Sequence, residues 1–238
     1  MTNSRGLAIM SRARDVLGPR MVGPVARRIR ADNLTYLTWS KLRSLERACD
    51  EARVLPGHVV ECGVALGGSG ILMSTLLPDR DFHGYDVFQT IPAPGDNDPP
   101  EAHERYAEIA SGRSAGLNGE KYYGYIDDLY SRVIDSFARY GVPVGERVQL
   151  HRGLFDETLM PQWPVALAHI DCDWYDPVKL CLERLTPHLV PNALMVMDDY
   201  FDYGGCRRAT DEHVASNPEF TVLRDAGHRV LRYAPAST

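Results

Sequence analysis

The feature that most constrains the fold is a glycine-rich stretch that directly follows a short apolar segment. Residues 58–62 read His-Val-Val-Glu-Cys, and four of the next eight residues are glycine. Such a run is typical of the tight turn between a buried β-strand and the helix after it. A second short apolar segment, residues 82–86, ends on an acid. We therefore predict a right-handed βαβ unit in this part of the chain.

The rest of the chain continues the alternation of strands and helices. Apolar residues at helical spacing predict helices over residues 34–54 and 125–140. Further strands are predicted at residues 147–150, 165–170 and 193–197, and a terminal hairpin at residues 221–223 and 229–233. This order indicates an α/β fold with a mainly parallel sheet and helices on both faces.

Two segments stand outside this alternation. Residues 87–121 are rich in Pro, Gly, Asp and Asn and are longer than most connections in a compact domain, so we predict a mobile lid. We predict that residues 1–55 form an N-terminal helical extension and residues 56–238 the main domain. Because the extension is too polar to add much to one core, we expect it to border the site and pack across a homodimer. Its first part is rich in arginine (Arg5, Arg12, Arg14, Arg20, Arg27, Arg28 and Arg30).

The composition excludes several classes of protein. Hydrophobic residues at 44% are enough to close a core, and the net charge of −6 argues against a nucleic-acid binder and for a neutral or cationic substrate. Five cysteines without a CxxC pair indicate reduced thiols and a cytoplasmic location. No apolar run approaches the roughly 18 residues of a membrane span.

The glycine turn and the acid after the second strand predict a cofactor site. Gly63, Gly67 and Gly68 would let a ligand approach the backbone, and Asp86, about 20 residues on, can accept hydrogen bonds from ribose hydroxyls. This pattern favours a nucleoside-bearing cofactor over a merely structural turn. Glu61 is either a solvated charge at the strand end or a contact to the charged amino acid part of the cofactor.

Acidic residues also follow two neighbouring strands of the predicted sheet. Asp171 and Asp173 come after one strand, and Asp198 and Asp199 come after the next. Because parallel strands end at the same edge, these carboxylates should converge, and without a cation they would repel one another. Oxygen ligands alone favour Mg²⁺. The alternative is that these acids only cap the following helices.

Two histidines lie near the same edge. His169 falls inside an apolar strand and is expected to be a core residue or a neighbour of the metal ligands. His151 closes a strand, so it is a candidate for substrate contact.

Five motifs together resemble the macrocin O-methyltransferase family over about residues 35–216. They are Glu61-Cys-Gly-Val-Ala-Leu-Gly-Gly-Ser69, Asp86-Val-Phe-Gln-Thr-Ile-Pro92, Arg152-Gly-Leu-Phe-Asp-Glu-Thr-Leu159, His169-Ile-Asp-Cys-Asp-Trp-Tyr175, and Asp198-Asp-Tyr200 followed by Cys206-Arg-Arg-Ala. The chain departs from the usual pattern at Cys172, where glycine is common, and at Pro177, where a hydroxyl residue is common.

The resemblance implies a Rossmann-like class I methyltransferase fold with a seven-stranded sheet, S-adenosylmethionine and Mg²⁺. It implies that Asp171, Asp198 and Asp199 hold the metal and that Asp173 is the general base. Residues assigned to the cofactor are Glu61, Gly63, Gly67, Gly68, Ser69, Asp86 and Asp171, and those assigned to the substrate are His151 and Tyr200.

The resemblance further implies a saccharide or glycoside acceptor. This acceptor is either a deoxysugar of an antibiotic or the 1-hydroxyl of a methylated mannoside in mycobacterial polysaccharide biosynthesis. We prefer a sugar to a catechol because no lysine neighbours the acidic motifs in the sequence.

Two alternatives remain at this stage. A short-chain dehydrogenase would use Gly63-x-x-x-Gly67 and Tyr175-x-x-x-Lys179, although Pro177 should disturb the helix that aligns this pair and the acids would have no role. The other alternative is an inactive methyltransferase-like partner that only binds.

Overall fold

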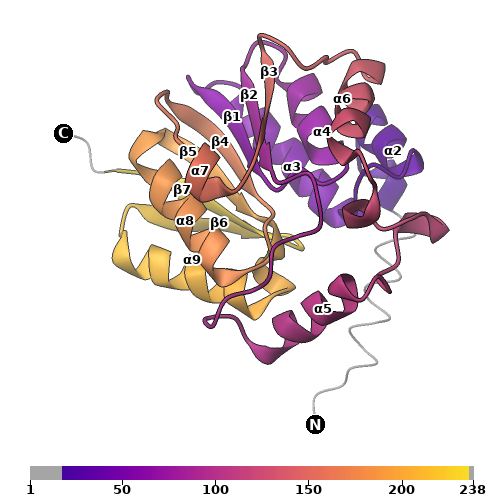
Figure 1. Ribbon diagram of the computed structural model, residues 1–238. Helices are drawn as coiled ribbons and strands as arrows, with labels where there is room; N and C mark the ends of the chain where they lie inside the picture. The colour runs from indigo at the N-terminus through magenta and orange to yellow at the C-terminus, as the bar shows by residue number, and fades with distance from the viewer. Residues whose placement is uncertain (1–17, 236–238) are drawn as a thin grey trace.

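The computed structural model describes residues 18–235, and its centre is a seven-stranded sheet (Figure 1). The strand order is β3-β2-β1-β4-β5-β7-β6; β1 to β5 pair in parallel, and β7 runs antiparallel to both β5 and β6. The strands are β1 (His58–Cys62), β2 (Phe82–Asp86), β3 (Val148–Arg152), β4 (Val165–Ile170), β5 (Leu189–Met197), β6 (Phe220–Asp225) and β7 (Arg229–Tyr233). The predicted α/β class and the predicted strands are confirmed.

Helices cover both faces of this sheet, as predicted (Figure 1). One face packs against α2, α3, α4 and α6, and the other against α8 and α9. The α-helices are α2 (Pro24–Ala31), α3 (Trp39–Ala52), α4 (Gly68–Leu76), α5 (Pro100–Ala110), α6 (Leu129–Arg139), α7 (Phe155–Thr158), α8 (Tyr175–Leu185) and α9 (Gly204–Ser216). Short 3-10 turns are η1 (Gly18–Arg20), η2 (Leu117–Gly119), η3 (Tyr123–Tyr125), η4 (Thr186–His188) and η5 (Asp198–Phe201).

The strand side chains alternate between two apolar cores. Val59 contributes to the core under α3 and α4, whereas the next residue, Val60, contributes to the core under α8 and α9. This alternation follows from the two-residue repeat of an extended strand. Both faces are covered, so the parallel strands read as continuous apolar runs.

The N-terminal helices belong to the main core. Ile29 of α2 and Leu42 and Leu45 of α3 are fully buried in the same cluster as the sheet. The expectation that this segment adds little to one core is therefore wrong, because the apolar faces of both helices cover α4. The homodimer and the division at residue 55 remain predictions. Arg5, Arg12 and Arg14 lie outside the described residues.

Helix α3 begins later than its apolar pattern suggested. Thr38 is the N-cap, and its side chain accepts a hydrogen bond from the backbone N–H of Lys41 at 3.3 Å. Residues 34–38 are consequently extended and come to lie along a pocket.

The segment 87–121 contains a helix that the sequence analysis missed. Helix α5 has prolines at its start and few apolar residues, Ala102 and Ile109 being its buried ones. Its weak apolar pattern explains why the segment was predicted to be only a lid.

The cysteines and the helix lengths bear on two of the predictions made from composition. All five cysteines are buried and free, as expected for reduced thiols. Among residues 18–235, no helix is long and apolar enough to cross a membrane.

Candidate active site

A pocket of about 980 Å³ lies at the carboxyl ends of the parallel strands. Its lining draws on the segments that follow β1, β2, β4 and β5 and on the extended stretch before α3. Open parallel sheets bind their ligands at this edge. Of the predicted site residues, Gly63, Ser69, Asp86 and the four acids Asp171, Asp173, Asp198 and Asp199 line this pocket.

The turn after β1 reaches the pocket through Gly63. Its φ is +93°, and a Cβ there would lie 1.8 Å from the carbonyl oxygen of Asp171. Glycine is required because the end of β4 passes directly against this backbone. The predicted glycine turn is thus in contact with the predicted metal-binding segment.

The other glycines of the turn have a different role from the one predicted. Gly68 donates its N–H to the carbonyl of Leu34 at 2.9 Å, and a Cβ on Gly67 would lie 3.0 Å from the Phe137 ring. Neither glycine is part of the pocket lining, whereas Ser69 is. Gly67 and Gly68 therefore serve close packing of α4 against its neighbours.

Asp86, at the end of β2, lines the pocket as predicted. Its Oδ2 accepts hydrogen bonds from the backbone N–H groups of Val64 at 2.7 Å and Ala65 at 2.9 Å, and its Oδ1 accepts one from Phe88 at 2.5 Å. Burial raises the pKa of this carboxyl group, and the three hydrogen bonds oppose that shift. Asp86 therefore orders the glycine turn, and among residues 18–235 its Oδ1 has one donor.

Glu61 does not reach the pocket. Its side chain is fully buried, and Oε1 lies 3.0 Å from Nδ1 of His169. Burial lowers the pKa of His169, but the hydrogen bonds to Asp198 and Glu61 outweigh burial and raise the pKa well above its usual value. The predicted cofactor contact is replaced by a buried pair, because Glu61 points toward β4, where His169 is its neighbour in register.

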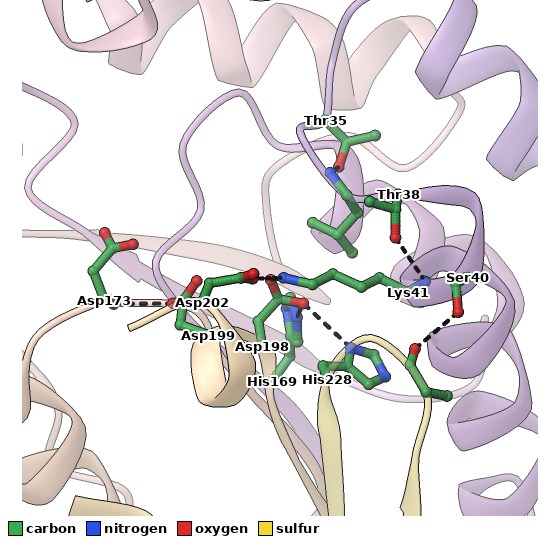
Figure 2. Close-up of polar contacts among 12 residues, drawn as sticks. Thr35, Thr38, Ser40, Lys41, His169, Asp173, Asp198, Asp199, Asp202 and His228 are labelled. Atoms are coloured by element: carbon green, nitrogen blue, oxygen red, sulfur yellow. Dashed lines mark hydrogen bonds and ion pairs between the residues drawn. The ribbon is translucent and has the colours of Figure 1, made fainter. Parts of the chain in front are cut away.

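The predicted convergence of carboxylates is confirmed. Asp171, Asp198 and Asp199 each offer one oxygen, and these oxygens lie within 4.8 Å of one another. Asp173 joins the cluster through its backbone, whose N–H donates to Oδ2 of Asp199 at 3.0 Å (Figure 2). Its φ of +58° is unusual for a residue other than glycine and is a form of strain that concentrates at functional sites.

The acids of the cluster differ in protonation. Burial and the neighbouring Asp198 and Asp199 raise the pKa of Asp171 well above its usual value, and burial and Asp198 raise the pKa of Asp199 to about 7. Burial also acts to raise the pKa of Asp198, but His169, His228 and Lys41 outweigh it and hold the pKa well below the usual value. These shifts favour the ionised form of Asp198 and the protonated form of Asp171, and a bound cation would displace protons from the cluster.

Lys41 is the main site residue that the sequence analysis missed. Its Nζ lies 2.5 Å from Oδ2 of Asp198 and 2.7 Å from Oδ2 of Asp202 (Figure 2). Along the sequence no lysine neighbours the acidic motifs, but in the folded protein Lys41 does. The expectation that no lysine lies near the acids is therefore wrong. A signal was present, because Lys41 shares helical spacing with Leu45, Ala48 and Ala52, so a charge lies on the apolar face of the helix.

His228 is a second missed residue, from the turn between β6 and β7. It is fully buried, and its Nδ1 lies 3.2 Å from Oδ1 of Asp198. Nε2 of His169 lies 3.4 Å from the same oxygen, so His169 is a buried neighbour of a predicted metal ligand, as expected. Nothing in the spacing of the sequence links His228 to the acids.

Aromatic residues and α5 also contribute to the wall of the pocket. Tyr122, Tyr123 and Tyr203 line the pocket, as does Arg105 of α5. Trp174 also lines it and donates its indole N–H to the carbonyl of Pro92 at 3.0 Å. The segment 87–121 thus borders the site, as a lid would, while its mobility remains a prediction.

The comparisons with known proteins identify the family of this chain. The family model described as Macrocin-O-methyltransferase (TylF) matches residues 31–219. The chain belongs to the macrocin O-methyltransferase family.

Relatives with a named reaction include two from Streptomyces. One, from Streptomyces olivaceus, is 8-demethyl-8-(2,3-dimethoxy-alpha-L-rhamnosyl)-tetracenomycin-C 4'-O-methyltransferase; it is 29% identical over 77% of this chain and 64% of its own length. The other, demethyldecarbamoylnovobiocin O-methyltransferase from Streptomyces niveus, is 29% identical over 68% of this chain and 59% of its own length. The chain therefore spans less than two thirds of these relatives.

Solved structures support the fold assignment. The O-methyltransferase NovP superposes with a TM-score of 0.69 at 23% identity, covering 85% of this chain and 83% of that chain. CalS11, a calicheamicin methyltransferase, superposes with a TM-score of 0.64 at 19% identity, covering 99% of this chain and 95% of that chain. The predicted Rossmann-like class I methyltransferase fold is confirmed.

The two residues assigned to the substrate, His151 and Tyr200, do not line the pocket. His151 stacks on Tyr85, with ring centroids 4.4 Å apart, and the Tyr200 hydroxyl donates to Asp211 at 2.8 Å. His151 precedes the pocket-lining residues that begin at Gly153, and Tyr200 points to α9. The structure therefore gives neither residue a substrate contact.

The positions of Tyr175 and Lys179 in the structure do not support the dehydrogenase alternative. The hydroxyl of Tyr175 donates to Glu212 of α9 at 2.6 Å, and neither Tyr175 nor Lys179 lines the pocket. Pro177 does not disturb this helix, contrary to expectation, because α8 begins at Tyr175 and a proline in the first turn is tolerated.

Proposed function

We propose that this protein transfers the methyl group of S-adenosylmethionine to a sugar hydroxyl in the presence of Mg²⁺. The observation that carries the proposal is the convergence of Asp171, Asp198 and Asp199 in the same pocket as Gly63 and Asp86. Membership in a family of O-methyltransferases and the rhamnosyl group in the name of one relative support the reaction and the acceptor.

The cofactor is assigned to the half of the pocket formed after β1 and β2. Gly63 and Ser69 line it. Within the described part of the chain, Oδ1 of Asp86 accepts one backbone N–H, from Phe88, which leaves a lone pair for a ribose hydroxyl. S-adenosylmethionine, when bound, supplies a methyl group already activated on a sulfonium. The protein then has to hold the acceptor oxygen in line with that methyl group and exclude water.

The donor set of the carboxylate cluster fits Mg²⁺. All three groups are hard oxygen donors, and their mutual separation of up to 4.8 Å allows them to share one ion. Mg²⁺, when bound, would stabilise negative charge on the acceptor oxygen and lower the pKa values of the surrounding carboxyl groups. Asp171, Asp198 and Asp199 would each contribute one oxygen.

Asp173 is assigned the role of general base. Burial, Asp199 and Asp198 raise the pKa of its carboxyl group well above the usual value, which makes the carboxylate a stronger proton acceptor. A carboxylate oxygen of Asp173 would take the proton of the acceptor hydroxyl as the new carbon–oxygen bond forms. The hydrogen bond from its backbone to Asp199 keeps the base beside the metal ligands.

Lys41 is not assigned the role of base. Burial lowers the pKa of its ammonium group, but Asp198, Asp199 and Asp171 outweigh burial and raise the pKa above the usual value. The residue therefore stays charged. A carboxylate base remains the assignment, although the preference for sugars over catechols now rests on the family and its relatives.

The charge of the pocket favours an uncharged acceptor. Among residues 18–235, eight aspartates and two basic residues, Lys41 and Arg105, line it. This excess of acidic over basic side chains disfavours a phosphorylated acceptor such as a nucleotide sugar. A glycoside is the better fit, either an antibiotic deoxysugar or a methylated mannoside.

A methyl-transfer assay with labelled S-adenosylmethionine and Mg²⁺ tests the proposal. The acceptors are methylated mannosides, antibiotic glycosides that lack one methyl group, a nucleotide sugar and a catechol. Label on a glycoside is the expected result, and label on the catechol alone would overturn the sugar acceptor. Binding of S-adenosylhomocysteine without transfer to any acceptor would favour the inactive partner.

A further inference from the structure

The ammonium group of Lys41 lies between two carboxylates that differ in burial. It contacts Oδ2 of Asp198, whose side chain is 4% exposed, and Oδ2 of Asp202, whose side chain is 52% exposed. Its aliphatic part passes beside Gly227, where a Cβ would lie 3.2 Å from Cγ of Lys41. Lys41 is thus held by the turn of the β6–β7 hairpin and directed into the cluster (Figure 2).

The two oxygens of Asp198 have different partners. Oδ1 is 3.4 Å from Nε2 of His169 and 3.2 Å from Nδ1 of His228, both fully buried. Among the described residues, Oδ2 has Lys41 as its hydrogen-bond partner. A metal ion that uses Asp198 would therefore take the oxygen that Lys41 now holds, because Oδ1 is enclosed by the two imidazoles.

We propose that Lys41 is a built-in counter-cation of the carboxylate cluster, which competes with the metal ion for Oδ2 of Asp198 and retreats to Asp202 when the ion binds. The proposal rests on the metal site of the proposed function. Asp202 makes the retreat feasible, because it already shares the ammonium group and is open to solvent. Lys41 is in this view a positioning residue that sets the affinity of the site for cations.

The variant Lys41→Met tests the competition, because methionine keeps an apolar chain and removes the charge. Calorimetric titration of the full-length protein with MgCl₂ alone, without cofactor or acceptor, should show about tenfold tighter binding or more. Thermal denaturation without metal should show a lower Tm than wild type, since the carboxylates lose their counter-cation. Lys41→Gln keeps a hydrogen-bonding side chain without the charge and should give the same gain in affinity for Mg²⁺. It replaces Lys41→Met in this test if the methionine variant does not fold.

Two further variants separate competition from a general charge effect. Lys179→Met removes an exposed lysine outside the pocket, so its affinity for Mg²⁺ and its Tm should equal those of wild type. Asp202→Asn removes the second position for the ammonium group and should weaken Mg²⁺ binding, and this loss should be smaller when Lys41 is already replaced by methionine.

The outcomes distinguish this proposal from the proposed function. If wild type binds Mg²⁺ and both Lys41 variants bind it equally or more weakly, the competition is wrong and the metal site stands. If neither wild type nor the Lys41 variants bind Mg²⁺, the metal site itself is wrong and the competition fails with it.

Discussion

The backbone N–H of Asp173 donates a hydrogen bond of 3.0 Å to the side chain of Asp199. The contact joins the residue assigned as base to one assigned as metal ligand, and it comes from the backbone of Asp173. A substitution that changes only the side chain of Asp173 therefore leaves the link in place. The two roles can be separated by mutation.

Asp173→Asn should lower the rate of methyl transfer by roughly 10²–10⁴, the usual effect of losing a general base. Asparagine also tolerates the positive φ of +58° at this position, so the backbone bond to Asp199 should persist. Calorimetry should then show unchanged binding of Mg²⁺ and S-adenosylhomocysteine. Loss of Mg²⁺ binding in this variant would mean that Asp173 is a ligand instead of the base.

Asp198→Ala should abolish Mg²⁺ binding and methyl transfer and should also destabilise the protein without metal. It leaves His169, His228 and Lys41 without their shared carboxylate, and breaking a buried ion pair of this kind costs about 3–5 kcal/mol of the free energy of unfolding. Urea denaturation measures the loss.

Asp171→Asn is the matched comparison, since burial and its acidic neighbours raise the pKa of Asp171 and favour its neutral form. Its free energy of unfolding should equal or exceed that of wild type. Equal losses in Asp198→Ala and Asp171→Asn would contradict the assignment of Asp198 as the ionised member.

Removal of metal by EDTA should silence methyl transfer, and added MgCl₂ should restore it. The same addition should raise the Tm of the metal-free protein, because an ion that binds only the folded state stabilises it. Activity that persists in EDTA would show that the carboxylates have another role.

Gly63→Ala should destabilise the fold and abolish cofactor binding. The positive φ alone costs about 1–2 kcal/mol for alanine, and the new Cβ would meet the Asp171 carbonyl at 1.8 Å. If Gly63→Ala unfolds and binds cofactor like wild type, the backbone at Gly63 is less constrained than its positive φ indicates.

Calorimetry on wild type should show heat with S-adenosylhomocysteine and none with NAD.

Stability should fall as the pH decreases from about 6.5 to about 4 because of His83. Burial lowers the pKa of His83 to about 4, with His58 and His151 lowering it further, whereas the unfolded chain has a value of about 6.5. Between these values only the unfolded state takes up the proton, so the folded state loses stability as the pH falls.

His83→Phe keeps the stacking on Trp163, whose ring lies 4.0 Å away, and removes the proton site. Urea midpoints measured across this pH range should decrease less steeply in the variant. Identical slopes in the two proteins would assign the pH dependence to other groups.

The sequence predicted the sheet well because parallel buried strands leave a strong apolar signal. Residues 165–170 are entirely buried, and the acids that follow them mark the edge of the sheet. Helix α5 was missed because its apolar residues are few. It packs through Ala102 and Ile109, and two buried residues in eleven leave only a weak periodic pattern.

The site was predicted only where its residues follow strands. Asp171 and Asp198 follow neighbouring strands, so their meeting is a consequence of topology. Lys41 and Asp198 are 157 residues apart, and their contact depends on how α3 packs over the end of the sheet, which no local pattern encodes. Glu61 was misassigned because the end of a strand does not reveal which way a side chain points.

The contact between Gly63 and the Asp171 carbonyl has a consequence for how the two ligands would share the pocket. The turn assigned to the methyl donor and the strand end assigned to the metal touch through their backbones, at Gly63 and through the hydrogen bond from the Asp171 N–H to the Cys62 carbonyl at 2.8 Å. The separation between sulfur and acceptor oxygen would then depend on these backbone contacts. Any effect of one ligand on the affinity for the other should act by the same factor in both directions.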